Sequence, residues 1–314
     1  MGWVRRASLP EAKHDCQALG VGNEIYVPTG SNDLTLDTVD IYDAETDSWR
    51  PGPPIPTCRG YIGAALLDER IYVLGGKQIR TAEEKRESGD DTHFKTRGEF
   101  EALDLTGQSW SCLPPLPSPR AGLTATACRG RVYAIAGVHM SKGGEPFDEV
   151  WSFDPALGRW EPGPPLPMAV WGPAAATVGD VIYVAGGGDG GFRDDLLALD
   201  PAADHEWKRL APLPTPRSDL SLAAVGGQIY AVGGKTCPSE EERWGCTGCV
   251  EIYDVDSDSW SPGPTLPMKS AWLATAVIGE RLFALGGARQ KRPDSTSRWT
   301  SAEFLDDVYE LVAA

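Results

Sequence analysis

The sequence of 314 residues lacks any apolar run approaching the ~18 consecutive residues that mark a membrane-spanning helix. Its opening, MGWVRRASLPEAKHD, also lacks the apolar stretch and small-residue cleavage site of a secretory signal. Basic residues are scarce, since 29 Lys and Arg stand against 45 Asp and Glu, for a formal net charge of −16. A surface this acidic repels nucleic-acid phosphates and anionic membranes, so we expect neither as a partner.

Cysteine and histidine are also sparse. Seven cysteines, an odd number in a large chain, are typical of a reducing compartment rather than of a disulfide framework. The four histidines stand in unrelated contexts, and neither a Ser-His-Asp nor a Cys-His motif can be recognised. We therefore predict a cytoplasmic protein without a recognisable catalytic nucleophile.

Glycine and proline, in contrast, are abundant, with 36 and 26 residues. Together with 41% hydrophobic residues, this composition is typical of many short strands joined by tight turns. Length alone suggests about two domains, but closed β architectures often exceed 200 residues as one unit. The composition therefore directs the search to internal repeats.

Six tryptophans mark such a repeat: Trp3, Trp49, Trp110, Trp160, Trp207 and Trp260. Seven residues after each lies a proline: Pro10, Pro56, Pro117, Pro167, Pro214 and Pro267. Twenty-three residues after each lies an aromatic residue: Tyr26, Tyr72, Tyr133, Tyr183, Tyr230 and Phe283. Twenty-seven residues after each lies a glycine: Gly30, Gly76, Gly137, Gly187, Gly234 and Gly287. Three columns in six copies predict six copies of one structural unit.

All the length variation falls between the glycine and the next tryptophan. Before the glycine, runs such as IGAALL and IYVLGG on either side of a turn predict a two-stranded hairpin. After it, a loop leads to segments such as VDIYD and VEIYD, and a short turn ends at the tryptophan. Each unit is therefore predicted to be a four-stranded antiparallel meander of about 50 residues.

Paired glycine, aromatic-containing strand and tryptophan at these offsets resemble the Kelch repeat over essentially the whole chain. Thr29-Gly30 and Ala136-Gly137 depart from the paired glycine but keep its second member. The resemblance implies an all-β, six-bladed β-propeller that occupies residues 1–314 as a single domain. The last repeat ends without a tryptophan, so we expect the N-terminal strand around Trp3 to close the ring. The last blade would then combine residues 270–314 with residues 1–8.

Three cysteines, Cys237, Cys246 and Cys249, lie close together in the insertion of the fifth repeat. The C-x-x-C spacing of Cys246 and Cys249 is compatible with a zinc or iron knuckle or with a redox pair. A single pair without a nearby histidine does not complete a metal-ligand set. We therefore favour ordinary loop cysteines and predict no cofactor.

Positive charge gathers in the column ten residues after each tryptophan, which reads Lys13, Arg59, Arg120, Val170, Arg217 and Ser270. The position after the glycine column adds Lys77 and Lys235. Both positions should lie at one mouth of the channel, together with Trp171 and Trp272. Because arginine presents a planar fork that suits carboxylates, these residues form the predicted ligand-binding set. The alternative is that the arginines bond to carbonyls of neighbouring blades.

Candidates for acid–base chemistry stand in and beside the column twelve residues after the tryptophan. They are His14, Asp15, Tyr61 and Asp219. No spacing motif connects them, so they are candidates by position alone.

Two functions follow from these features. The first is a monomeric, non-enzymatic propeller that binds an acidic peptide or anionic small molecule at the Arg/Lys-rimmed mouth. Kelch-domain substrate adaptors, which the chain resembles, recognise acidic peptides with arginines at the positions of Arg59, Arg120 and Arg217. The second is an isomerase or mutarotase acting on an anionic sugar, since the chain is similar in size to bacterial Kelch propellers that act on sialic acid. A metal-dependent Kelch enzyme is a less favoured third alternative.

Overall fold

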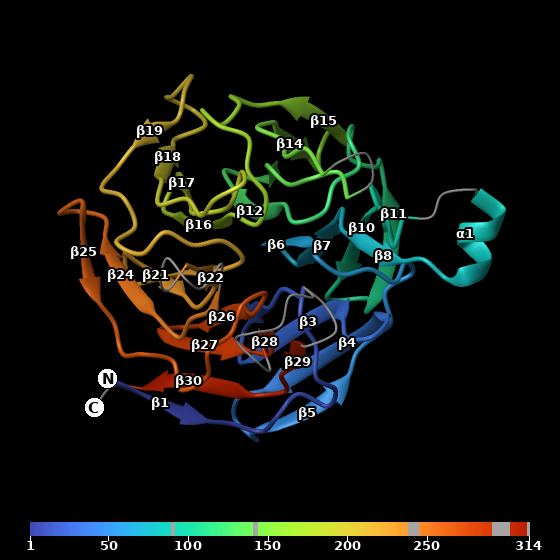
Figure 1. Cartoon of the computed structure of the whole chain (residues 1–314), viewed down its shortest axis with the longest axis horizontal. Helices are drawn as coiled ribbons and strands as arrows, with labels where there is room; N and C mark the ends of the chain where they lie inside the picture. The colour runs from blue at the N-terminus through green and yellow to red at the C-terminus, as the bar shows by residue number, and fades with distance from the viewer. Residues whose placement is uncertain (89–91, 141–143, 238–244, 291–301, 313–314) are drawn as a thin grey trace.

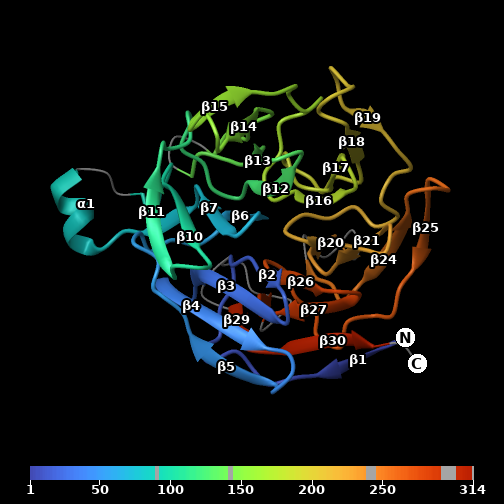
Figure 2. The same cartoon turned by 180° about the vertical axis from the view of Figure 1, so that it is seen from behind.

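The computed structural model describes residues 1–88, 92–140, 144–237, 245–290 and 302–312. Six four-stranded antiparallel sheets stand radially about a central axis, each sheet forming one blade (Figures 1 and 2). This arrangement confirms the predicted six-bladed β-propeller. Among the described residues, no helix has the length and hydropathy needed to cross a membrane.

In each blade the strands run from an inner strand at the axis to an outer strand at the rim. Blade 1 contains β2 (Leu19–Val21), β3 (Glu24–Ser31), β4 (Thr35–Asp43) and β5 (Ser48–Pro51). Blade 2 contains β6 (Gly63–Leu67), β7 (Arg70–Leu74), β10 (Phe100–Asp104) and β11 (Ser109–Leu113). Blade 3 contains β12 (Thr124–Cys128), β13 (Arg131–Ile135), β14 (Val150–Asp154) and β15 (Arg159–Pro162).

The remaining blades follow the same order. Blade 4 contains β16 (Ala174–Val178), β17 (Val181–Ala185), β18 (Leu196–Leu199) and β19 (Lys208–Arg209). Blade 5 contains β20 (Ser221–Val225), β21 (Gln228–Val232), β24 (Val250–Asp254) and β25 (Ser259–Pro262). Blade 6 contains β26 (Ala274–Ile278), β27 (Arg281–Leu285), β30 (Val308–Val312) and β1 (Gly2–Arg5).

The N-terminal strand closes the ring, as predicted. β1 pairs with β30 in an antiparallel register that sets Trp3 opposite Leu311. The blade therefore takes its outer strand from one end of the chain and its other three strands from the opposite end (Figure 1). Pairing β1 with β30 covers a strand edge that would otherwise be exposed.

The insertions of blades 2, 5 and 6 form two-stranded hairpins. They pair β8 (Lys77–Ile79) with β9 (Phe94–Thr96), β22 (Lys235–Thr236) with β23 (Gly245–Cys246), and β28 (Ala288–Gln290) with β29 (Ala302–Phe304). The helix α1 (Ala82–Ser88) belongs to the blade 2 insertion and projects beyond the ring (Figures 1 and 2). Each insertion starts beside an inner-strand entry, as the bridges Gly60↔Lys77, Ser218↔Lys235 and Ala271↔Ala288 show. We call this end of the propeller the insertion face.

The repeat columns hold neighbouring blades together. Each aromatic residue of the tyrosine column is buried between blades, with at most 6% exposure. Each tryptophan of the repeat donates its indole N–H to a backbone carbonyl four residues after the preceding tryptophan. The acceptors for Trp3, Trp49, Trp110, Trp160, Trp207 and Trp260 are Pro264, Ala7, Pro53, Pro114, Pro164 and Ala211. Most of these indoles are half-buried, so they act as inter-blade hydrogen-bond donors as well as packing surface.

Candidate functional site

The column arginines Arg59, Arg120 and Arg217 lie inside their blades, where their side chains have no exposed surface. Their guanidinium groups form ion pairs with Glu101, Glu149 and Glu251 on the third strand of the same blade or just before it. Each also donates to backbone carbonyls, as Arg59 does to Gly75 at 2.9 Å and to Val73 at 3.0 Å. The prediction that these guanidinium groups rim an open mouth is therefore wrong. They stabilise the interior of each blade instead, because the backbone carbonyls to which they donate belong to the same blade.

Lys13 occupies the same column in blade 1 and has the same internal role. Its side chain is fully buried, bonds to Thr38 Oγ1 at 3.0 Å and forms an ion pair with Asp40. A sequence signal for this pairing exists, because Asp40, Glu101 and Glu251 each lie nine residues before the next tryptophan. Blade 4, where the column holds Val170, has Ala198 at that position.

The column two residues further on forms the insertion-face mouth. Its members Asp15, Tyr61, Gly122, Gly172, Asp219 and Trp272 all have a positive φ, between 54° and 62°. Each backbone N–H donates to the carbonyl of the equivalent residue in the preceding blade, at 2.7–3.1 Å. Asp15 donates to Trp272, so the six bonds form a closed ring around the axis. We call this set the inner ring.

The tyrosine of the inner ring reaches across the axis. Tyr61 donates its hydroxyl to Asp219 Oδ1 at 2.5 Å, from blade 2 to the opposite blade 5. Its path crosses Gly122 and Gly172. A Cβ on Gly122 would lie 2.6 Å from the Tyr61 ring, and one on Gly172 would meet Asp219 Oδ1 and the Tyr61 hydroxyl. These two glycines therefore leave the space in which the Tyr61 side chain crosses the central axis to Asp219.

Lys235 lies between two indoles at this mouth. Its Nζ is 4.8 Å from the centroid of Trp171 and 4.4 Å from that of Trp272, and it forms a 2.5 Å ion pair with Asp219. A cation between two aromatic faces is stabilised by their quadrupoles. Because both indoles are only half-buried, they give the mouth a partly exposed aromatic surface.

A second buried cluster lies next to Trp272, whose ring centroid is 6.0 Å from that of His14. Lys77 Nζ lies 2.8 Å from Asp15 Oδ2, and His14 Nδ1 lies 3.2 Å from the same oxygen. The imidazole of His14 stacks on Phe304, with 4.8 Å between ring centroids. Among the described residues, Asp15 Oδ1 is buried and has no hydrogen-bond partner.

The structure thus brings together all four candidates for acid–base chemistry, but the pKa values of Asp15 and Tyr61 are displaced away from the neutral range. Burial acts to raise the pKa of Asp15, yet His14 and Lys77 outweigh it and hold that pKa well below its usual range. Burial, with the adjacent Asp219, raises the pKa of Tyr61 well above its usual value. A general acid or base works best with a pKa near the operating pH, and neither group meets this condition.

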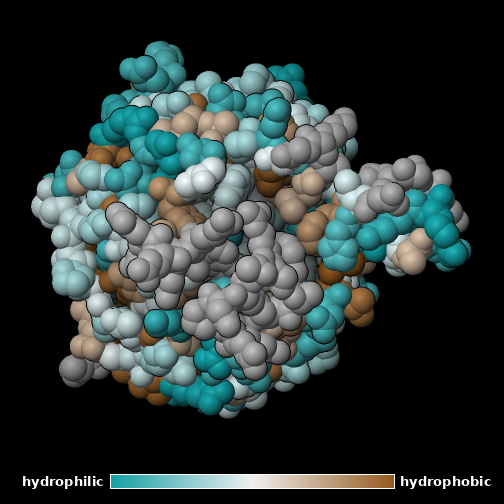
Figure 3. All heavy atoms as spheres, viewed as in Figure 1, coloured by the Kyte–Doolittle hydropathy of each residue, from teal (hydrophilic) through white to brown (hydrophobic). Residues whose placement is uncertain are grey.

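Among the described residues of the mouth, both lysines are paired with carboxylates. Lys77 pairs with Asp15, and Lys235 pairs with Asp219. With the three arginines neutralised inside the blades, the insertion face offers fixed ion pairs framed by aromatic rings. The rim of this face is mostly hydrophilic, with separate hydrophobic patches (Figure 3).

In the described part of the chain no disulfide joins any of the cysteines, Cys246 and Cys249 included. Burial raises the pKa of Cys246 to about 11, which makes its thiolate scarce at neutral pH. Within the described ranges, no group of three or more His, Cys, Asp or Glu side chains is placed to hold a metal ion. A zinc or iron site at Cys237, Cys246 and Cys249 stays a sequence-based alternative.

Residues 88–234 match the family model described as the KLHDC2/KLHL20/DRC7 Kelch-repeats domain. Residues 12–56 and 216–267 match the model described as the Kelch motif. A solved structure titled "Structure of YjhT" has a TM-score of 0.78 and covers 96% of this chain and 95% of that chain, at 17% identity. That likeness concerns the fold alone.

Curated relatives are longer proteins. The chain is 27% identical to Kelch-like protein 40 of Mus musculus, over 73% of this chain and 35% of that protein. It is 26% identical to Kelch-like protein 41b of Danio rerio, over 89% of this chain and 43% of that protein. It is 28% identical to Kelch-like protein 34 of Homo sapiens, over 82% and 39% respectively. The chain therefore spans well under half the length of these relatives.

Proposed function

Since this chain belongs to the Kelch-repeat β-propellers, we propose that it is a non-enzymatic binding module that holds a protein partner on its insertion face. The observation that carries the proposal is the arrangement of Trp171 and Trp272 on either side of Lys235. Tryptophan is one of the residue types enriched in the hot spots of protein interfaces, which cluster near the interface centre. The hairpins of blades 2, 5 and 6 lie at the same end and extend the available surface.

The charge of the partner is a finer part of the proposal. With the arginines buried, an acidic preference depends on Lys77 and Lys235, which are already paired with aspartates. A partner carboxylate would have to compete with Asp219 for Lys235. We propose that a single partner carboxylate pairs with Lys235, the cation that the two indoles flank.

The alternative of an isomerase or mutarotase acting on an anionic sugar draws support from one observation, the convergence of His14, Asp15, Tyr61 and Asp219. The displaced pKa values of Asp15 and Tyr61 favour binding over catalysis. An NMR anomer-exchange assay with acidic sugars separates the two functions. We expect the anomers to exchange at the uncatalysed rate. If the protein accelerated the exchange and the Tyr61→Phe variant did not, the result would support the enzymatic function.

Cytoplasmic location and a monomeric state belong to the same proposal. Seven cysteines, an odd number in a large chain, are typical of a reducing compartment rather than of a disulfide framework. The net charge of −16 opposes nucleic acid and anionic membranes as partners.

The binding proposal is tested by selecting peptides from a random display library on the immobilised protein. Selected peptides are expected to bind the wild type and to lose at least about tenfold in affinity with Trp171→Ala/Trp272→Ala, as removal of interface hot spots does. Glu280→Gln, an exposed change in the hairpin turn between β26 and β27, is the control. Peptides that bind the double variant unchanged would show that the aromatic mouth is not the binding site. Selected peptides that contain neither Asp nor Glu would reject only the proposed preference for an acidic partner, and not the binding site.

A further inference from the structure

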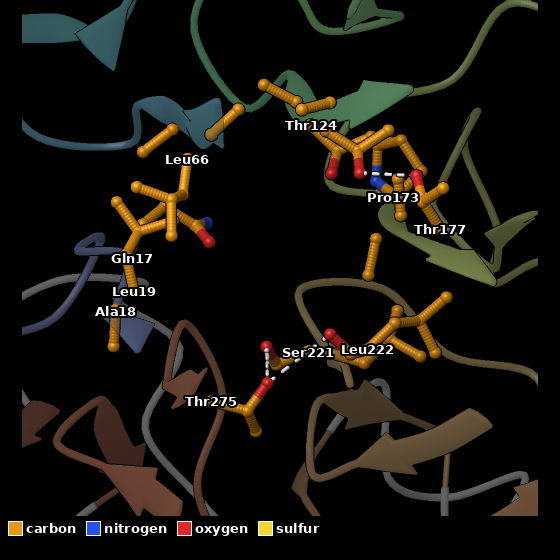
Figure 4. Close-up of a pocket in the computed structure, with 18 residues that line it drawn as sticks. Gln17, Ala18, Leu19, Leu66, Thr124, Pro173, Thr177, Ser221, Leu222 and Thr275 are labelled. Carbon is orange, nitrogen blue, oxygen red and sulfur yellow. Dashed lines mark hydrogen bonds between the residues drawn. The ribbon is translucent and has the colours of Figure 1, made fainter. Parts of the chain in front are cut away.

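Beneath the inner ring, the axis of the propeller contains a cavity of about 240 Å³ (Figure 4). At the density of liquid water, this volume would hold about eight water molecules. All six inner-strand regions contribute to its wall. The cavity is distinct from the aromatic mouth, because none of the mouth residues lines it.

The wall of this cavity is neutral but polar. Its described lining contains neither a charged nor an aromatic side chain. Its apolar residues are seven alanines, four leucines and one proline, and its hydrogen-bonding residues are Gln17, Thr124, Thr126, Thr177, Ser221 and Thr275. The small residues keep the axis wide enough for the cavity to exist.

The hydrogen-bonding groups lie on different sides of the cavity. Thr126 and Thr177 share a 2.8 Å hydrogen bond between blades 3 and 4, and Ser221 and Thr275 share one of 2.7 Å between blades 5 and 6. Figure 4 shows Gln17 across the cavity from Thr177. In the part of the chain that the structure describes, the Gln17 amide has no hydrogen-bond partner.

One end of the cavity is closed. Pro173 and Leu220 of its wall directly follow Gly172 and Asp219 of the inner ring, and Tyr61 spans that ring. Approach is therefore from the opposite end, among the turns of the inner hairpins. A molecule in the cavity and a partner on the insertion face would not compete for space.

We propose that the axial cavity binds a small, neutral, polyhydroxylated molecule of the monosaccharide or polyol class. Hydroxyl pairs that both donate and accept can exchange bonds with ligand hydroxyls, and alanine methyl groups contact the ligand C–H surface. A charged ligand would lose its hydration without gaining an ionic partner, so the neutral wall selects against it. This inference is independent of the proposed function at the mouth.

The test is saturation-transfer NMR on the whole protein with three probes: glucose, myo-inositol and glucuronate. Transfer to glucose or myo-inositol is expected, and glucuronate should show at least tenfold weaker binding. The variant Thr126→Val/Thr177→Val removes both members of one hydroxyl pair at nearly constant shape, so it leaves no buried group unpaired. It should weaken binding of the neutral probe by about tenfold.

Two further variants make the result decisive. Gln17→Leu removes an amide that has no partner among the described residues and should also weaken binding, even if the double valine variant folds poorly. Trp171→Ala, at the mouth, should leave sugar binding unchanged. The proposal is overturned if neither neutral probe binds, if glucuronate binds as well as glucose, or if the folded Thr126/Thr177 and Gln17 variants bind like the wild type.

Discussion

At Arg59 the guanidinium group donates to the carbonyls of Gly75 and Val73 and to the carboxylate of Glu101, without any exposed surface. Removing one member of such a buried pair leaves the other charge without compensation. The side chains of this column therefore stabilise blades. A loss of binding in an arginine variant has to be separated from a loss of fold.

We predict that Arg59→Ala lowers the free energy of unfolding by about 3–5 kcal/mol, because Glu101 is left buried and unpaired. The double variant Arg59→Met/Glu101→Leu should recover most of this loss, since both charges are gone and similar volume remains. Urea unfolding measures both values. An Arg59→Ala protein as stable as the wild type would contradict the internal role of this arginine.

The misplacement of the arginines has a physical reason. Column spacing places a residue along its blade, but it does not say whether a long side chain extends into solvent or folds back beneath a neighbouring strand. The acidic residues on the third strand decide this in blades 1, 2 and 5. The positive φ of Tyr61 and Trp272 was not predicted either, because such residues rarely adopt that conformation, although the glycines and aspartates of the same column do so more readily.

Among the elements, β1 depends on ion pairs as well as on its pairing with β30. Glu310 of β30 accepts hydrogen bonds from Arg6 at 2.7 Å and from Arg281 at 2.7 and 3.0 Å. Burial acts to raise the pKa of Glu310, but the hydrogen bonds and charges of Arg281 and Arg6 outweigh it and lower that pKa below its usual value. The cluster therefore connects β27, β30 and the residue that follows β1.

A pH dependence follows from this cluster. Because the pKa of Glu310 is lower in the folded state, its contribution is complete above the usual carboxyl range and is lost as the pH falls through the folded value. We expect Glu310→Gln to be less stable than the wild type at about pH 7, with the difference shrinking toward about pH 3. Thermal unfolding at several pH values measures this. A difference that does not change with pH would exclude the ionised pair as its cause.

Element prediction succeeded where the repeat was regular. The hairpins before each glycine, and the two strands after it, follow the predicted order in all six blades. The short helix α1 was not predicted, since it lies in the segment of variable length between the glycine and the next tryptophan. Insertions lie outside the repeat, so the fixed spacing of its columns does not predict their structure.

At the scale of the whole molecule, two rings of hydrogen bonds join the blades. The tryptophan indoles form one toward the rim, and the positive-φ backbone forms the other at the axis. Both are closed by N-terminal residues, Trp3 in the first and Asp15 in the second. This closure was predictable, because Trp3 has the same phase as the other five tryptophans.

We predict that deleting residues 1–8 exposes the edge of β30 and leads to aggregation or a marked loss of thermal stability. A synthetic peptide of residues 1–12 added in trans should restore stability, and the same peptide with Trp3→Ala should not. Size-exclusion chromatography and thermal unfolding measure the effect. A truncated protein that stays monomeric with unchanged stability would refute the closure.

The central claim is that binding takes place at the half-exposed indoles of the insertion face and not at the buried arginines. The most direct measurement is a ¹H–¹⁵N spectrum of the indole N–H groups during titration with a selected peptide. The signals of Trp171 and Trp272 should shift with a common affinity, while those of the six repeat tryptophans, bonded to backbone carbonyls, stay in place. A saturable shift confined to the repeat tryptophans, with Trp171 and Trp272 unchanged, would contradict the account.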